Sequence, residues 1–169
     1  MEYRGNKIIK SIIAGIGILI LSILEKNIVF FSPFIKIGLS NIIILILIGY
    51  FDLKYLMLIA LFKVIPSFLL SGGIVNPAFF CSFVTVIVSV PFMYFFIKKL
   101  KFSVIPVSIL SSVMNIYLQI AIVSIYLDVS CIKLMRVFYP VAIVAGAITG
   151  IIGQNIIKKG YIDYAFIRK

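Results

Sequence analysis

Lys63 is the residue with the clearest potential for chemistry, because it lies within a strongly apolar run from Tyr55 to Leu70. A lysine at the centre of a membrane helix costs about 2.5–3.5 kcal/mol on insertion scales, so such residues usually face the bundle interior. We expect every acidic residue to lie in a loop or tail, out of easy reach of Lys63: Glu2, Glu25, Asp52, Asp128 and Asp163. Lys63 is therefore predicted to face a ligand, and an unpaired cation favours an anionic one. Snorkelling to an interface, or a structural ion pair, is the alternative.

A polar stripe in the run from Val104 to Leu127 is the second signal. Its members are spaced i, i+3, i+4, i+7 and i+11, which places them on one helical face: Ser108, Ser111, Ser112, Asn115 and Gln119. Such a face is not expected to contact lipid. It forms either the wall of a pocket or a set of hydrogen bonds between helices.

These polar residues could converge with two further asparagines in the outer half of the bundle. Asn115 is expected at about the depth of Lys63, and Gln119 one turn nearer the outside. The sequence thus predicts a pocket for a small molecule that opens outwards and is contacted by Lys63, Asn115, Gln119, Asn41 and Asn76.

Small residues at four-residue spacing mark two helices as closely packed. One set lies near the C-terminus and comprises Ala142, Gly146, Gly150 and then Gly153, and the other comprises Ser11 and Gly15. Packing within the bundle explains the spacing directly. The alternative is a surface that docks another membrane subunit.

The sequence lacks the residue clusters that most enzymes require. It has no His, its acids are scattered singly, and neither Cys81 nor Cys131 has a Cys-x-x-Cys partner. No P-loop is present. We therefore expect no catalytic residues, no metal site and no cofactor, and we interpret the chain as something other than an enzyme.

The elements that position these residues are predicted to be membrane helices. The chain is 63% hydrophobic, with a mean hydropathy of +1.26, against about 45–50% apolar residues in a soluble domain. We predict an all-α integral membrane protein, a single domain over 1–169 that forms a bundle of about six transmembrane helices, at 8–24, 37–51, 55–70, 77–97, 104–127 and 137–157. The apolar segment 28–35 is too short to span and could act as a lid.

The basic residues predict the orientation and the setting. With both termini cytoplasmic, eleven Lys and Arg fall on the inner side and four on the outer side, in agreement with the positive-inside rule. The net charge of +11 is therefore attributed to helix ends that meet anionic lipid, and no nucleic acid is expected as a partner. The predicted location is the cell membrane, as a multi-pass protein.

Several of these segments together resemble a known family. They are IGLSNI at 37–42, Lys63, LSGGIVNPAF at 70–79, Asn115 with Gln119, and GAITG at 146–150. The chain resembles the Gx transporter family of bacterial inner membranes, whose members are also labelled heptaprenyl diphosphate synthase component I. The resemblance covers about residues 8–158. More loosely, the chain is similar to the S components of energy-coupling factor transporters.

The resemblance implies a six-helix bundle that captures a small molecule from outside. A separate transmembrane coupling subunit and two ABC-type ATPases would drive uptake, and Ser11 and Gly15 would map to the docking residues of helix 1. The synthase label implies instead a non-catalytic membrane partner of a heptaprenyl diphosphate synthase or of an isoprenoid- or quinone-related system. The scattered acids favour uptake over synthase chemistry.

Overall fold

The computed structural model of the chain describes residues 2–27, 38–70, 76–127 and 130–158, and within these ranges it contains helices and no strands. Three helices are long and apolar enough to cross a membrane: Pro77–Lys99, Val104–Tyr126 and Met135–Ile156. The first helix carries a shorter apolar run, Ser11–Glu25. The predicted fold class, an all-α membrane bundle, is confirmed.

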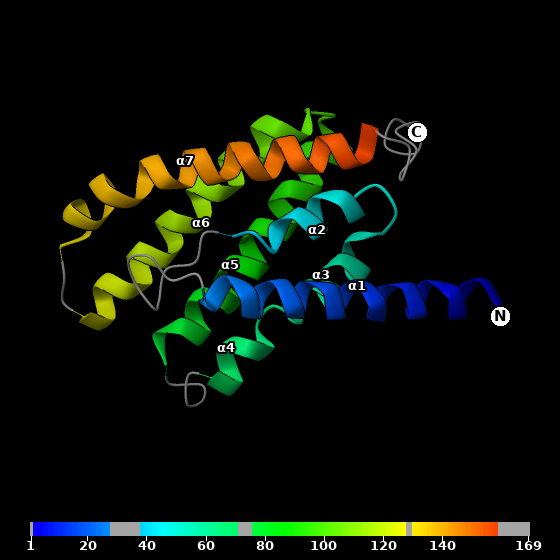
Figure 1. The fold of residues 1–169 in the computed structure, drawn as a ribbon, viewed down its shortest axis with the longest axis horizontal. Helices are drawn as coiled ribbons and strands as arrows, with labels where there is room; N and C mark the ends of the chain where they lie inside the picture. The colour runs from blue at the N-terminus through cyan, green and yellow to red at the C-terminus, as the bar shows by residue number, and fades with distance from the viewer. Residues whose placement is uncertain (1, 28–37, 71–75, 128–129, 159–169) are drawn as a thin grey trace.

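The helices follow one another with short connections where these are described (Figure 1). In chain order they are α1 (Glu2–Asn27), α2 (Asn41–Leu47), α3 (Leu53–Leu61), α4 (Ile65–Leu70), α5 (Pro77–Tyr94), the π-helical segment η1 (Phe95–Lys99), α6 (Val104–Leu127) and α7 (Cys131–Ile156).

The expected span 55–70 is two helices, with a break at residues 62–64. Pro66 has no N–H, and its ring crowds the carbonyl four residues earlier. At the break, each of three consecutive amides donates a hydrogen bond to the carbonyl three residues earlier. The N···O distances are 3.2 Å for Phe62, 3.0 Å for Lys63 and 2.9 Å for Val64. The break places Lys63 in irregular backbone.

Other boundaries also differ from the expected ones. The helix α1 continues through Glu25 to Asn27, and α2 covers only Asn41–Leu47 of the expected 37–51. The helix α7 begins at Cys131, directly after Ser130, and not at the start of the expected span 137–157. The bounds of α6 coincide with the expected 104–127.

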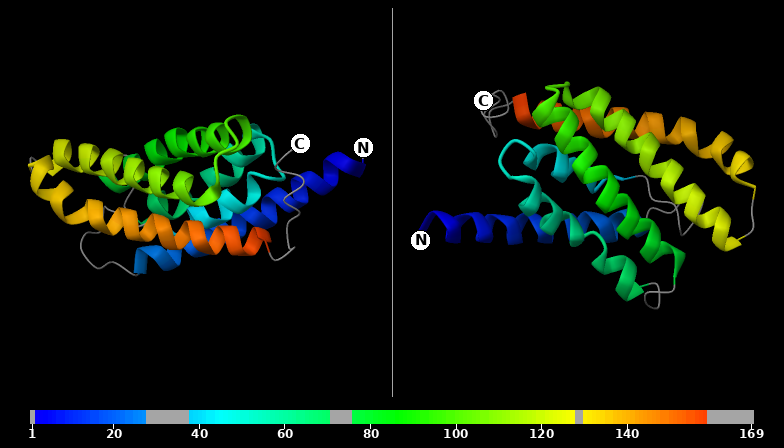
Figure 2. Two further views of the ribbon diagram at one scale, coloured as in Figure 1. Left: turned by 90° about the horizontal axis from the view of Figure 1, so that it is seen from above. Right: turned by 180° about the vertical axis from the view of Figure 1, so that it is seen from behind.

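The helices pack in a regular order around the interior. The pair α6 and α7 makes the most extensive contact, α5 packs on α6, and α3 packs between α1 and α5, while α2 lies against α7. In the views of Figures 1 and 2, the start of α1, the α2–α3 turn, the segment between η1 and α6, and the end of α7 gather at the same end of the bundle. The basic residues predict that this end is cytoplasmic, and the orientation stays a prediction.

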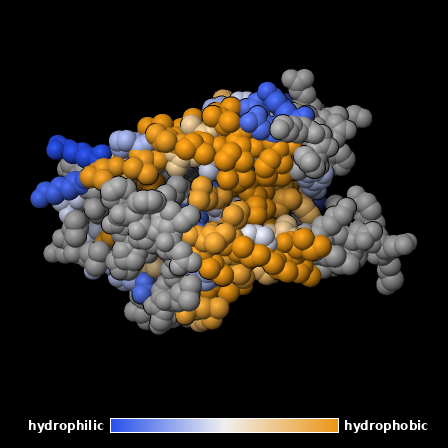
Figure 3. All heavy atoms as spheres, in the orientation of Figure 1, coloured by the Kyte–Doolittle hydropathy of each residue, from blue (hydrophilic) through white to orange (hydrophobic). Residues whose placement is uncertain are grey.

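The surface carries a broad apolar band. Figure 3 shows hydrophobic residues across the middle of one face and hydrophilic residues towards its two ends. Among the most exposed large side chains are Ile125 at 81%, Leu69 at 69% and Ile13 at 64%. Such a band is expected where lipid rather than water surrounds the helices.

Candidate functional site

The centre of the candidate site is a contact between Lys63 and Asn41. The Lys63 Nζ atom donates a hydrogen bond of 2.9 Å to Asn41 Oδ1, and the two side chains are only 4% and 6% exposed. The backbone of Lys63 is also contacted by α1, because the Ser22 hydroxyl donates a hydrogen bond of 3.4 Å to the Lys63 carbonyl. The structure thus brings together two of the five predicted ligand-binding residues, from the α3–α4 break and the start of α2.

Glu25 corrects the expectation that all acids lie in loops or tails, away from Lys63. It belongs to the last turns of α1 and is 4% exposed. Its carboxylate accepts hydrogen bonds from the Gly38 amide and, at 3.3 Å, from the Ser40 hydroxyl. It also lies close enough to Lys63 for the opposite charges to attract. Lys63 therefore has an opposite charge nearby, and its charge alone does not require an anionic ligand.

The turn 38–41 positions Asn41 against Lys63. Gly38 has a φ of +95°, which side-chain-bearing residues rarely adopt. The Asn41 amide donates to the Gly38 carbonyl at 2.9 Å, and this bond closes the turn. A Cβ at Gly38 would lie 3.1 Å from Asn41 Nδ2. Glu25 therefore anchors a turn whose shape depends on glycine and whose last residue binds Lys63.

The bonding capacity of Lys63 determines what this site can bind. An ammonium group has three N–H donors, and the described contacts use one of them, on Asn41 Oδ1. The remaining donors suit an acceptor oxygen, such as one from a carboxylate, phosphate or carbonyl group. The arrangement offers hydrogen bonding and charge to such an acceptor.

The polar stripe of α6 divides into two parts. Ser108 shares a 2.8 Å hydrogen bond with Thr149 of α7, as expected of a contact that joins helices. In contrast, three atoms further along are buried without a hydrogen-bond partner in the described part of the chain: Ser111 Oγ, Ser112 Oγ and Asn115 Oδ1. Unsatisfied buried polar atoms cost roughly 1–3 kcal/mol each. This part of the stripe therefore has unused capacity to bind a ligand.

The helix α5 separates the polar stripe of α6 from the α3–α4 break that contains Lys63. The helix α6 packs mainly against α5 and α7, whereas α3 and α4 pack against α5. Two adjacent residues of α5 contact these two regions. Ser82 shares a 2.7 Å hydrogen bond with Ser67 of α4, and the Cys81 thiol lies 3.8 Å from the Gln119 carbonyl of α6. Cys81 is buried and forms no disulfide.

Asn76 has a clear local role. Its side-chain oxygen accepts a 2.9 Å hydrogen bond from the Ala78 amide and so caps α5, which begins with Pro77. An asparagine cap of this kind stabilises a helix start by about 1 kcal/mol. The predicted ligand contact of Asn76 is left as a prediction.

The small residues pack helices within the chain. A Cβ on Gly146 would lie 2.8 Å from the Ile109 Cα, and one on Gly150 would lie 2.9 Å from the Ile105 Cα. Gly153 has more room, with its nearest neighbour at 3.8 Å. The neighbouring Ala142 is buried on the same helix.

The small residues of α1 also face the interior. Ser11 is buried, and a Cβ on Gly15 would meet the ring of Phe62 at 2.8 Å. Gly15 therefore lets α1 approach α3 closely, and the expected docking role of Ser11 and Gly15 stays a prediction.

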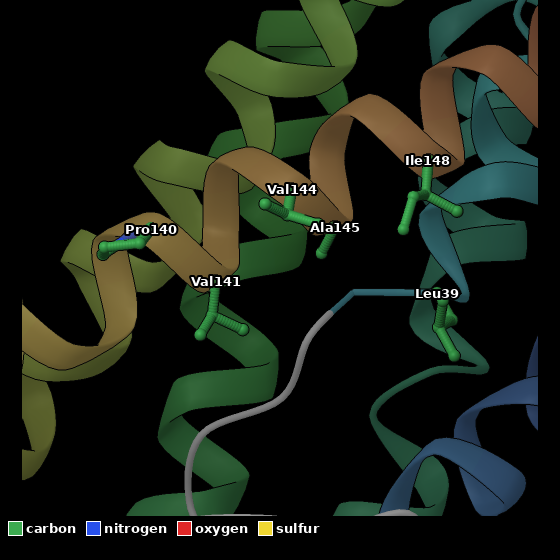
Figure 4. Close-up of a pocket in the computed structure, with 6 residues that line it drawn as sticks. All are labelled: Leu39, Pro140, Val141, Val144, Ala145 and Ile148. Carbon is green, nitrogen blue, oxygen red and sulfur yellow. The ribbon is translucent and has the colours of Figure 1, made fainter.

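The predicted lid, 28–35, lies outside the described residues. An apolar pocket of about 460 Å³ lies along α7 (Figure 4), and none of the five predicted ligand-binding residues lines it. Among the described residues, no group of three or more His, Cys, Asp or Glu side chains could hold a metal ion.

The fold is that of a helical membrane protein with a buried polar contact, between Lys63 and Asn41, at a helix break. A family model described as heptaprenyl diphosphate synthase component I matches residues 14–156 of the chain. The chain belongs to this family, as the resemblance in its motifs predicted. No curated protein and no solved structure matches it.

Proposed function

We propose that this protein is the substrate-binding membrane subunit of an uptake system, in the manner of the S components of energy-coupling factor transporters. The observation that carries the proposal is the buried contact between Lys63 and Asn41 at the break between α3 and α4. Irregular backbone within a membrane is tolerated where protein covers it or where it lines a cavity. A lysine at such a break, with donors that the described contacts do not use, is typical of a ligand site.

The ligand in this proposal is a small molecule with one carboxylate or a comparable acceptor group. Lys63 would bind that group, and Asn41 would orient the ammonium. Because the carboxylate of Glu25 lies near Lys63, a ligand with several negative charges would be repelled. A molecule with a single anionic group therefore fits better than a diphosphate. Asn76 and, on α6, Asn115 and Gln119 are the other proposed contacts. A ligand that reaches α6 would have to extend past α5 from Lys63.

The same proposal assigns a partner to α1. One face of this helix is apolar and exposed, with Ile13 at 64% and Leu24 at 51%. A membrane-embedded coupling subunit with ABC-type ATPases would dock there, in the cell membrane, with Ser11 and Gly15 allowing α1 to lie close to α3. Docking at α1 would reach the ligand site directly, since Ser22 and Glu25 extend from the same helix to Lys63 and the 38–41 turn.

A second candidate function follows from the family description. The chain would then be a non-catalytic membrane partner of a heptaprenyl diphosphate synthase, or of a related isoprenoid or quinone system. In that case Lys63 and Glu25 would stabilise the fold rather than bind a ligand.

Ligand retention separates these candidates. The protein would be purified from its native membranes in mild detergent, and the small molecules it retains would be extracted and identified by mass spectrometry. We expect a compound that co-purifies with the wild type and is lost from Lys63→Leu. The control, Lys54→Leu, removes an exposed lysine of α3 and is expected to keep the compound. Equal retention by both variants would contradict the proposed site.

A further inference from the structure

The apolar pocket on α7 carries an inference that is independent of the proposed uptake function. Its volume of about 460 Å³ lies within the roughly 300–1,000 Å³ of small-molecule sites. Figure 4 shows side chains of α7 along one side and Leu39, from the turn before α2, on the other. The lining consists of hydrocarbon side chains: Leu39, Pro140, Val141, Val144, Ala145 and Ile148. The pocket is therefore suited to a hydrocarbon chain.

The pocket lies on a helix that is apolar over the length of a membrane. Its lining residues Val144 and Ile148 are 58% and 49% exposed, and both belong to the candidate span Met135–Ile156. From Pro140 to Ile148 the helix rises about 12 Å, which is less than half of a hydrocarbon core of about 30 Å. A hydrocarbon chain entering from one membrane surface would follow α7 over this distance.

Two cations lie at one end of the pocket. Arg136 precedes Pro140 and Val144 at four-residue spacing, so the three share a face of α7. Lys133 lies eight residues before Val141 and therefore also near this face. Both cations are exposed, and the described part of the chain gives neither an ion-pair partner. The candidate span begins at Met135, so both cations lie at its start, where lipid headgroups are expected.

We propose that this pocket and the two cations form a binding site for an anionic phospholipid. One acyl chain fills the pocket between α7 and Leu39, and the phosphate group binds Arg136 and Lys133. Charge complementarity decides the class of lipid: an arginine can bind phosphate oxygens through two parallel hydrogen bonds, and each cation near a membrane surface strengthens binding to anionic lipid. A zwitterionic headgroup would gain less from the same cations.

Native mass spectrometry of the full chain in mild detergent tests the headgroup. Phosphatidylglycerol and phosphatidylcholine with identical acyl chains would be titrated separately. We expect tighter binding of phosphatidylglycerol, and a loss of about fivefold in its affinity in Arg136→Gln or Lys133→Gln. Lys158→Gln removes an exposed cation at the other end of α7 and is expected to leave the affinity unchanged. Equal binding of the two lipids by the wild type would overturn the proposal.

A second pair of variants tests the pocket. Val144→Trp places a large side chain in the lining and is expected to reduce phosphatidylglycerol binding. Ile143→Trp makes the same kind of change at a neighbouring position that is 49% exposed and outside the lining, and it is expected to bind normally. Equal binding by these two variants would contradict the pocket as the site.

A competition experiment distinguishes a phospholipid from a prenyl diphosphate, since both join a phosphate group to a hydrocarbon chain. Farnesyl diphosphate would be added to the phosphatidylglycerol complex. Displacement only at a large excess supports a phospholipid site. Displacement at concentrations below that of the phospholipid would overturn the phospholipid assignment in favour of a prenyl diphosphate.

Discussion

The α6–α7 seam and the junction around Lys63 solve the problem of burying polar groups in opposite ways. At the seam, two long regular helices approach closely because Gly146 and Gly150 have no side chain, and a hydroxyl pair, Ser108 with Thr149, joins them. At the junction, a helix end, a glycine turn and a helix break surround a buried acid and a buried lysine.

The difference separates what holds the bundle together from what could bind a ligand. The seam uses the backbone bonds of unbroken helices and needs few side-chain bonds. The junction combines charges with irregular backbone, which is costly in a membrane unless it serves a purpose. Changes at the junction should therefore alter stability and ligand binding together, whereas changes at the seam should alter stability.

The largest effect is expected at Glu25. Glu25→Ala removes the acceptor for the Gly38 amide and the Ser40 hydroxyl, and it leaves Lys63 without its compensating charge. We expect a loss of about 3 kcal/mol in the free energy of unfolding. Unfolding in detergent, followed by circular dichroism, measures it. The exposed acid Asp52 provides the control, since Asp52→Asn should change stability by less than about 0.5 kcal/mol.

A double-mutant cycle with Lys63→Met tests the origin of this effect. If the two charges compensate each other, the double variant should lose less stability than the sum of the two single losses. Additive losses would show that Glu25 acts only through its hydrogen bonds to the turn.

A smaller loss is expected at the seam. Gly146→Ala would place a Cβ 2.8 Å from the Ile109 Cα, so the helices would have to separate. We expect a loss of about 2 kcal/mol. Gly153→Ala meets its nearest neighbour at 3.8 Å and should be tolerated. Thermal unfolding of the two variants side by side measures the difference. Similar melting temperatures would contradict the close approach of α6 and α7.

The smallest effect distinguishes the two parts of the α6 stripe. Ser108→Ala loses the hydrogen bond to Thr149 and should cost about 1 kcal/mol. Ser111→Ala removes a hydroxyl without a partner in the described chain and should be neutral or slightly stabilising without ligand. The same unfolding assay applies, and a larger loss for Ser111→Ala would mean that its hydroxyl is satisfied.

The helices themselves were largely predictable from the sequence, and their interruptions were less so. Hydropathy predicted both ends of α6 correctly, because a long apolar run with polar flanks is typical of a single membrane helix. It failed at 55–70, where Pro66 breaks the helix without lowering its hydropathy. It also failed at Cys131–Arg136, where the helix includes Lys133 and Arg136.

The site was predicted only in part. Lys63 and Asn41 were identified by their polarity within apolar runs, but Glu25 was assigned to a helix end because Lys26 follows it. A signal was present: Ser11, Gly15, Ile18, Ser22 and Glu25 follow one another at spacings of four and three, as one helical face does, and all five are buried. The non-local turn that joins Glu25 to Asn41 depends on the conformation of Gly38, which residue types alone do not specify.

The central claim is that this chain binds a small molecule for uptake with separate energising partners. Affinity purification of the full chain from native membranes in mild detergent, followed by mass spectrometry of the proteins that co-purify, tests it most directly. The account predicts a multi-spanning coupling protein together with ABC-type ATPases. Recovery of a prenyl diphosphate synthase or a flavoprotein in their place would contradict it and would favour the membrane-partner function.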